Sequence, residues 1–247
     1  MTQPTLLNNV DHGDLRIVTT RGEAWGDAMM SAVAVPAEFR SLQAHYPIVF
    51  QKTADGTGFQ PIALFGLQDG QNLFLGPRGW DAHTLPMSIE RQPFLIGIGG
   101  ADGNELLVQV DQDSPRLITG TGPVAGGFDA EPVFLPHGGH TEFLERINSL
   151  LLALHDGVQA TPAFVEALLA NDLLESFVLD VELVDGSQSR LAGLYTINED
   201  RLASLDGAAL DRLNRAGHLQ AIYMALASVA NFRDLIERLN RRLAPAA

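Results

Sequence analysis

Short hydrophobic runs separated by Asp-Gly pairs make up much of the first half of the chain. Asp-Gly readily adopts the positive φ angles of tight hairpin turns, so such a pair between two apolar runs predicts a β-hairpin. Three of these pairs stand at 55–56, 69–70 and 102–103. The apolar runs that flank them are 46–51, 59–67, 73–75, 94–98 and 106–110. This pattern predicts an antiparallel β meander.

A fourth pair, Asp185-Gly186, joins two longer apolar runs, 177–184 and 190–197. Hydrophobic and polar residues alternate in the first run, so that Phe177 and Leu179 fall on one face and Asp180 on the other. Because the side chains of a strand alternate between its two faces, this run predicts a hairpin with one face towards a hydrophobic core.

Hydrophobic residues at helical spacing dominate the rest of the second half. A stripe from Phe143 to Leu154 predicts a helix that ends at Asp156-Gly157. Thr161-Pro162 then predicts the cap and the first turn of a separate short helix. Asp206 is expected to cap a further helix that ends at Gly217.

The last long stripe, from His218 to Leu243, predicts an amphipathic helix, bent near 228–231, as the main helical cover of the hairpin. The fold class is therefore α+β, with an antiparallel β meander in the N-terminal half and helices plus a β-hairpin in the C-terminal half. We interpret residues 1–247 as one domain. A sub-division would separate a β-rich part, 1–140, from a helix-rich part, 141–247.

The chain is strongly acidic, with 16 basic residues, 30 acidic residues and a net charge of −14. This charge repels nucleic acids and anionic lipid surfaces, so we expect no nucleic-acid partner. Residues 208–247 hold six Arg and three acidic residues, a net charge of +3, which leaves −17 for residues 1–207. The Arg residues either form a solvated helix face or bind a partner. Those on the last helix are Arg233, Arg238, Arg241 and Arg242.

The sequence predicts neither a leader nor a membrane span. Its first basic residue is Arg16, whereas a signal peptide starts with a basic segment and an apolar stretch. Apolar runs such as 94–98 and 150–154 are far shorter than the roughly 20 residues that cross a bilayer. Cys is absent, which fits either redox compartment. We expect a cytoplasmic protein without membrane insertion, with the cell surface, reached without a leader, as the alternative.

The sequence contains no complete motif for nucleotide binding or for hydrolysis. Glycine-rich strings at 97–103 and 120–127 lead into a strand and into prolines, whereas a dinucleotide fingerprint must open a helix. Neither an HExxH zinc motif nor a GxSxG nucleophile elbow occurs. We therefore assign no catalytic residues and no cofactor.

His137 and His140 form the only close histidine pair in the sequence. With a carboxylate such as Glu142 or Asp129, neutral imidazoles would ligate zinc or iron. The Gly-Gly between the two histidines does not fix ligand geometry as a helical turn does. A polar loop before the Phe143 helix is therefore the preferred interpretation, and a metal site at His137 and His140 is the alternative.

Bulky and polar residues gather between the predicted strands of the meander. They combine aromatic anchors with hydrogen-bonding groups, although core and turn roles also account for such residues. Trp80 and Asp81 follow a Gly- and Pro-containing loop, and aromatic residues on such loops are preferred binding anchors. The candidate binding residues are Tyr46, Asn72, Trp80, Asp81 and Arg91.

Several segments together resemble the SapC family of bacterial proteins, which is distinct from the like-named peptide-transport permease. The resemblance runs from about Pro36 to the end of the chain. The segments that carry it in the first half are 45–50, 66–74, 79–81 and 91–94. Those in the second half are 185–186, 193–197, Asp200, Leu202, Ser228, Asn231 and Leu235.

The resemblance implies an association with surface layers or with systems that contain TonB-dependent receptors. It also implies flavin-dependent halogenase-like or cupin-like proteins as partners, and it brings no catalytic residues. We therefore predict an accessory protein that binds a protein or a peptide rather than an enzyme. The rival hypothesis is an enzyme, or the partner of one, in the oxidative modification of peptides or small molecules.

Overall fold

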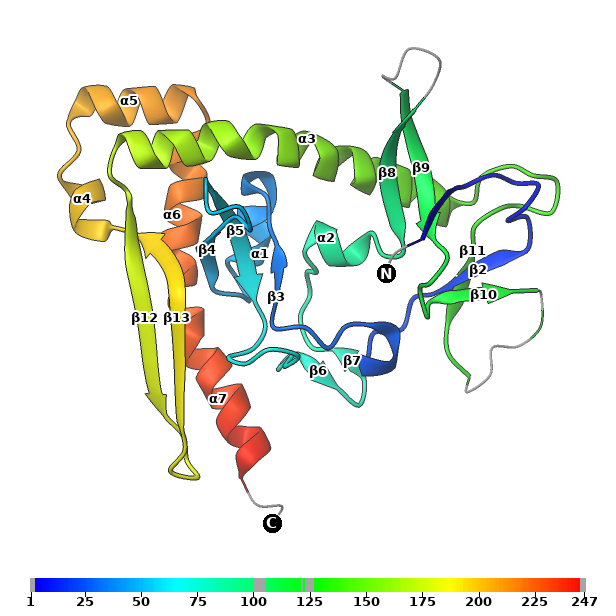
Figure 1. Ribbon diagram of the computed structural model, residues 1–247, viewed down its shortest axis with the longest axis horizontal. Coiled ribbons are helices and arrows are strands. Elements are labelled where there is room, and N and C mark those ends of the chain that lie inside the picture. The colour runs from blue at the N-terminus through cyan, green and yellow to red at the C-terminus, as the bar shows by residue number, and fades with distance from the viewer. Residues whose placement is uncertain (1–2, 100–104, 121, 123–126, 245–247) are drawn as a thin grey trace. The chain divides into compact units, whose positions relative to one another are not determined.

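The computed structural model describes residues 3–99, 105–120, 122 and 127–244 (Figure 1). Antiparallel sheets dominate the first half and helices the second, which confirms the predicted α+β class. The chain divides into two compact units, each made of segments that are distant in sequence. Unit 1 comprises Met1–Asp27, Pro77–Trp80 and Met87–Asp156, and unit 2 comprises Ala28–Gly76, Asp81–Pro86 and Gly157–Ala247. That the whole chain acts as one domain stays a prediction.

Unit 1 contains two small antiparallel sheets. The first has the order β1-β9-β8, from β1 (Pro4–Leu6), β9 (Glu105–Asp111) and β8 (Phe94–Gly99). The second has the order β10-β2-β11, from β10 (Leu117–Thr119), β2 (Leu15–Val18) and β11 (Ala130–Pro132). β8 and β9 pair as the predicted hairpin, whose turn at 102–103 lies outside the described residues.

The core of unit 1 lies between these strands and the first half of α3 (Glu142–Ala170). Phe143, Ile147 and Leu151 recur at helical spacing and pack with Leu15 and Phe94. Three short elements complete the unit: η1 (Glu23–Trp25), β7 (Gly79–Trp80) and α2 (Met87–Glu90).

Unit 2 is built on a five-stranded antiparallel sheet of order β12-β13-β4-β5-β3. Hairpins β4–β5 and β12–β13 turn at Asp55-Gly56 and Asp185-Gly186, as predicted. The strands are β3 (Ser31–Val33), β4 (Ile48–Lys52), β5 (Phe59–Leu64), β12 (Leu174–Glu182) and β13 (Gln188–Ile197).

The hairpin predicted around Asp69-Gly70 is wrong. β5 ends at Leu64 and pairs with β3 and β4, and the next short strand is β6 (Leu75–Gly76). Between them the backbone folds tightly on itself. Gly66 lies so close to Gln71 that a Cβ at position 66 would be only 2.2 Å from the Gln71 carbonyl oxygen. Leu67 N–H also donates to Gln71 Oε1 at 2.9 Å. Asp69-Gly70 therefore lies in a compact loop and not in the turn of a β-hairpin.

The helices of unit 2 pack mainly on this sheet and on one another. Asp206 caps α5 (Gly207–Arg215) through a 2.7 Å bond from Ala209 N–H, as predicted. The predicted last helix is in fact two, α6 (His218–Ser228) and α7 (Asn231–Leu243), which meet within the predicted bend. Phe232 of α7 stacks on Phe177 of β12 at 5.1 Å between ring centroids, which confirms the predicted cover of the hairpin. The helical elements are η2 (Pro36–Glu38), α1 (Phe39–Leu42), the second half of α3, α4 (Glu199–Ala203), α5 (Gly207–Arg215), α6 (His218–Ser228) and α7 (Asn231–Leu243).

The predicted helix end at Asp156-Gly157 and the predicted short helix after Thr161-Pro162 are wrong, because α3 runs unbroken through both. Gly157 is buried, and a Cβ there would lie 2.7 Å from Val35, so this glycine permits close packing. Thr161 Oγ1 donates to the Gly157 carbonyl at 2.8 Å. Phe164 and Leu168 then continue the buried stripe, and tertiary burial outweighs the cost of Pro162.

Within the described ranges, no helix has the length and hydrophobicity required to cross a membrane.

Candidate functional site

The junction of α6 and α7 holds the segment that carries Tyr46. Ile48 N–H donates to Ser228 Oγ at 2.8 Å, and Asn231 Nδ2 donates to the carbonyls of Gln43 at 2.7 Å and Tyr46 at 3.2 Å. Ser228 and Asn231 therefore satisfy backbone groups of a distant loop at the point where the helix is interrupted. The interruption fixes the position of Tyr46.

Tyr46 is buried in an aromatic cluster with Phe65 and Phe74. Its ring lies 5.2 Å from that of Phe65 and 4.7 Å from that of Phe74, both edge-to-face. The hydroxyl donates to the Thr84 carbonyl at 2.6 Å. Such pairs add about 0.5–1.5 kcal/mol each beyond the area they bury. Since the Tyr46 side chain is fully covered, it acts by placing Phe74 and Thr84.

Arg238 of α7 closes this cluster from outside. Its guanidinium lies 4.3 Å from the centre of the Phe74 ring and donates to Asp81 at 2.9 Å and to Asp234 at 2.8 Å. Burial by itself lowers the pKa of Arg238, but hydrogen bonds and attraction from Asp234 and Asp81 outweigh burial and raise the pKa overall. The cation is therefore fixed in place between a ring and two carboxylates.

Arg242, one turn further along α7, holds the neighbouring backbone. It donates to the carbonyls of Asn72 at 2.9 Å and Leu75 at 2.6 Å. The buried Asn72 side chain accepts from Phe74 N–H at 3.0 Å, and Asp81 N–H donates to the Phe74 carbonyl at 2.7 Å. We call residues 72–76 and 81–84, held in this way by α7, the clamped surface.

The interpretation of the α7 arginines as one solvated face is wrong for Arg238, whose side chain is only 18% exposed. Arg242 is exposed, and it also donates to two carbonyls of the clamped surface. Arg233 and Arg241 are solvated, at 87% and 68% exposed.

The side chains that the clamped surface presents to solvent include Asp81, at 76% exposed, and His83. The His83 ring lies 5.8 Å from that of His45, which is half-buried. Burial lowers the pKa of His45, and the positive potential of His83 and Arg238 lowers it further. His45 is therefore neutral at pH 7, beside an acidic exposed Asp81.

The five candidate residues fall into two groups. Tyr46, Asn72 and Asp81 meet at the clamped surface, whereas Trp80 and Arg91 belong to unit 1. Trp80 is half-buried in β7. Arg91 donates to the Phe94 carbonyl, and burial lowers the pKa of its guanidinium.

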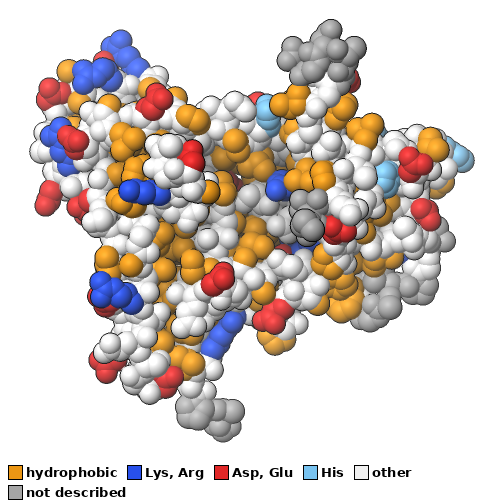
Figure 2. Space-filling model, in the orientation of Figure 1, with side chains coloured by type: hydrophobic (Ala, Val, Ile, Leu, Met, Phe, Trp, Pro, Cys, Tyr) orange, Lys and Arg blue, Asp and Glu red, His pale blue; other side chains and the backbone are white. Residues whose placement is uncertain are grey.

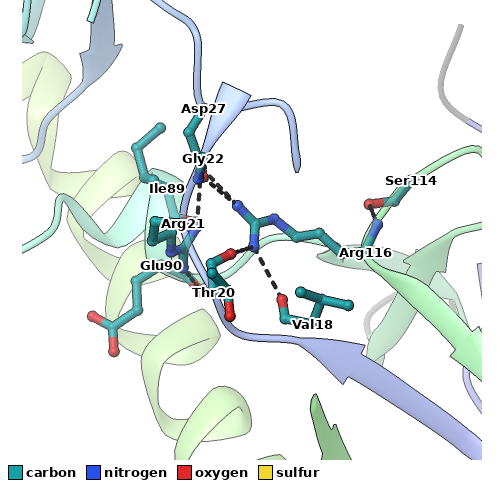
Figure 3. Close-up of polar contacts among 9 residues, drawn as sticks. All are labelled: Val18, Thr20, Arg21, Gly22, Asp27, Ile89, Glu90, Ser114 and Arg116. Carbon is teal, nitrogen blue, oxygen red and sulfur yellow. Dashed lines mark hydrogen bonds and ion pairs between the residues drawn. The ribbon is translucent and has the colours of Figure 1, made fainter. Parts of the chain in front are cut away.

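A buried ion cluster in unit 1 was not predicted from the sequence (Figure 3). Arg116 Nη2 lies 2.7 Å from both oxygens of Asp27, and these side chains are 1% and 0% exposed. Arg116 Nη1 donates to the carbonyls of Val18 and Thr20 at 3.0 Å each. Arg21 contacts Asp27 at 3.3 Å. Among the described residues, Arg116 Nε has no hydrogen-bond partner.

The electrostatics of this cluster favour a structural role. Burial lowers the pKa of Arg21, and repulsion by Arg116 lowers it further, while Asp27 opposes both effects. Gly22 N–H also donates to Asp27 at 2.8 Å. One carboxylate thus fixes two arginines and a backbone turn, and it ties the end of β2 to the segment before β10.

The His137 and His140 side chains are both exposed. The His140 ring lies 6.0 Å from that of Phe134, and the backbones of these two residues form an isolated antiparallel bridge that closes the loop between them. Within the part of the chain that the structure describes, no three His, Asp or Glu side chains converge in a way that could hold a metal ion. Among the described residues the alternative site at His137 and His140 has no third ligand, and a metal there stays a prediction.

The fold and the clamped surface define an α+β protein whose last helix fixes a partly buried segment that carries the exposed side chains of Asp81 and His83. The family model of SapC matches residues 7–235, and the chain belongs to the SapC family. No curated protein and no solved structure is detectably similar to the chain.

Proposed function

We propose that this SapC-family protein is a non-catalytic accessory protein that binds a protein or a peptide at the clamped surface. The observation that carries the proposal is the fixing of the clamped surface by Arg238 and Arg242, which hold its buried part and the exposed side chain of Asp81 in place. A segment ordered in advance loses little conformational entropy on binding, which favours recognition. Asp81 and His83 offer a carboxylate and an imidazole to a partner, while the ring of Phe74 is covered by Arg238.

The biological setting is part of the same proposal. Family membership supports an accessory role, in association with surface-layer systems or with TonB-dependent receptors. Flavin-dependent halogenase-like or cupin-like proteins are the partners to look for first, with the cytoplasm as the place of action.

The experiment is affinity capture from the native cell with the wild-type protein and two variants. Asp81→Ala combined with His83→Ala should lose the captured partner, because it removes both exposed groups of the clamped surface. Asp69→Ala, which removes an exposed carboxylate from a neighbouring turn, should retain it. Far-UV circular dichroism and thermal melting establish that each variant is folded. Equal capture by all three proteins would refute the clamped surface as the binding site.

Trp80 and Arg91 belong to unit 1 and are a separate proposal from the clamped surface, and the test of this proposal uses Trp80. Trp80→Ala should keep most of the thermal stability yet weaken capture if the ring is an anchor. A large loss of stability would show that Trp80 is a core residue instead.

Metal analysis tests the rival enzyme hypothesis. A stoichiometric transition metal that disappears in the His137→Ala, His140→Ala variant would overturn the non-catalytic proposal at that pair.

A further inference from the structure

β12 forms one edge of the unit 2 sheet over nine residues. In Figure 1 the half of β12 nearer the 185–186 turn is the outermost strand of this sheet. Natural edge strands are usually short, bulged, or interrupted by Pro or Lys, which prevents another strand from pairing with them. β12 contains neither Pro nor Lys. The irregularity of this hairpin lies on β13, where Ala192 and Gly193 together face Val178.

The hydrogen bonds at the two ends of the hairpin show which backbone groups face the open side. Asn198 N–H donates to the Leu173 carbonyl at 2.9 Å, and Leu183 N–H donates to the Ser187 carbonyl at 2.8 Å. In both bonds the residue on the β12 side, Leu173 or Leu183, is odd-numbered. In an antiparallel ladder alternate residues bond to one neighbour, so the even-numbered residues turn N–H and C=O to the open side. These residues are Ser176, Val178, Asp180 and Glu182.

The side chains of β12 also divide into two faces. Ser176, Val178, Asp180 and Glu182 are exposed on one face. Phe177, Leu179 and Val181 are half-buried on the other, on the side that packs with Phe232 of α7. A strand added to this edge would therefore meet acidic side chains on one face and an apolar border on the other.

The charge of the hairpin selects the kind of strand. Residues 174–197 hold four acidic residues and one Arg, a net charge of −3. On the face in view in Figure 2, Asp and Glu side chains lie along the lower part of the hairpin. Pairing with the same edge of a second copy would bring two such acidic hairpins together, and like charges oppose this. A basic strand would be attracted instead.

We propose that β12 binds an extended segment of a partner polypeptide, by strand addition, in which basic residues alternate with apolar ones. The basic side chains face Asp180 and Glu182, and the apolar ones cover the border formed by Phe177, Leu179 and Val181. The hydrogen bonds come from the even-numbered backbone groups of β12. This inference rests on the proposed function only for the partner class, a polypeptide, and concerns a different surface.

The test uses a synthetic peptide, so that it does not depend on capturing the native partner. The probe is a blocked, dye-labelled peptide in which Lys and Val alternate over the length of β12. Control peptides carry Glu in place of Lys, or a central Pro that removes a backbone donor. Fluorescence anisotropy at low salt measures affinity, and hydrogen exchange locates the protected amides. The wild-type protein should bind the Lys-Val peptide and protect the amides of Ser176, Val178, Asp180 and Glu182.

Two variants of the edge and one matched control follow. Val178→Pro removes an outward N–H and should weaken binding of the Lys-Val peptide about tenfold, since the edge loses one hydrogen bond to the added strand and the side-chain contact beside it. Glu182→Lys should weaken binding about threefold to tenfold at low salt, with a smaller effect at high salt. Glu166→Lys makes the same charge change at an exposed position of α3 and should bind like the wild type.

Three results would overturn the inference while leaving the clamped surface untouched. The first is no binding of the Lys-Val peptide to the folded wild-type protein. The second is equal weakening by Glu182→Lys and Glu166→Lys, which indicates attraction by net charge alone. The third is a dimer, measured by sedimentation, that Val178→Pro abolishes, because a second copy would then occupy the edge. Loss of native-partner capture by the Asp81 and His83 variant bears on the clamped surface and not on β12.

Discussion

Replacing Asp27 by Asn should destabilise unit 1 severely, because it removes the charge that compensates two arginines. Asp27→Asn leaves Arg116, which is 1% exposed, with only uncharged partners, namely the carbonyls of Val18 and Thr20 and the single remaining side-chain oxygen at position 27. The new amide nitrogen would also face a guanidinium donor where an oxygen now accepts. Removing one partner of a buried ion pair costs about 3–5 kcal/mol, and we expect this range for Asp27→Asn.

Urea unfolding monitored by tryptophan fluorescence measures this effect. The chain has 2 Trp residues, Trp25 and Trp80, and both belong to unit 1, so the signal reports on the unit that carries the cluster. The midpoint should fall with little change in the slope, since the surface exposed on unfolding is nearly the same.

The double variant Asp27→Leu, Arg116→Met is the matched control. Exchanging a whole buried ion pair for apolar residues of similar size is often nearly neutral, because no unpaired charge remains. We therefore expect the double variant to be more stable than Asp27→Asn. A loss below about 1 kcal/mol for Asp27→Asn would refute the reasoning, since so small a value is typical of an exposed pair.

Three further predictions concern unit 2. Ile222→Asp should unfold or aggregate the protein, because Ile222 is fully buried and an unpaired charge there costs several kcal/mol. Arg241→Glu, at an exposed position, should change the melting temperature little, and similar melting curves of the two variants by circular dichroism would contradict the helix register. Hydrogen bonds from Thr53, and then from Thr57, lower the pKa of Asp55 to about 2, so Thr53→Val should raise it towards 3.8 in an NMR titration, and an unchanged value would count against these bonds. Burial lowers the pKa of His45 from 6.5, so the contribution of His45 to the free energy of unfolding is present above pH 6.5 and is lost as the pH falls through the folded pKa. The His45→Gln variant should therefore lose less stability than the wild type between pH 7 and pH 5, measured by urea titrations followed by circular dichroism; equal losses would refute this.

Local patterns in the sequence predict the hairpins of this fold well. At Asp55-Gly56 and Asp185-Gly186 the turn residues and the flanking apolar runs lie within a few positions of one another. At Asp69-Gly70 the same signal misleads, because the contact between Gly66 and Gln71 closes a loop that the turn residues alone cannot reveal.

The error in α3 has a different cause. Asp156-Gly157 and Thr161-Pro162 are sound local signals for a helix end and a helix start. They are overridden by burial of Phe164 and Leu168 and by the close approach of Val35 to Gly157. This contact joins positions that are far apart in the chain, and a single sequence does not show it.

The candidate site is only partly predictable for the same reason. Tyr46, Asn72 and Asp81 stand out as bulky or polar residues between strands. Arg238, which holds Asp81 from 157 positions away, does not. One signal was available: Arg238 lies within the stripe formed by Leu235 and Leu239, where a wholly solvated arginine is not expected. Asp27 and Arg116 are 89 positions apart and carry no such signal.

The bonds at the α6–α7 junction also bear on the order of events during synthesis. Ser228 binds Ile48 across 180 positions, and Asn231 binds Gln43 across 188. A ribosome that has released β4 must therefore synthesise most of the remaining chain before these backbone groups find their partners. Closing such long loops is slow, and the half-finished sheet of unit 2 stays open to other strands in the meantime. Nascent unit 2 is thus the part of the chain in which a chaperone would find exposed strand edges for longest.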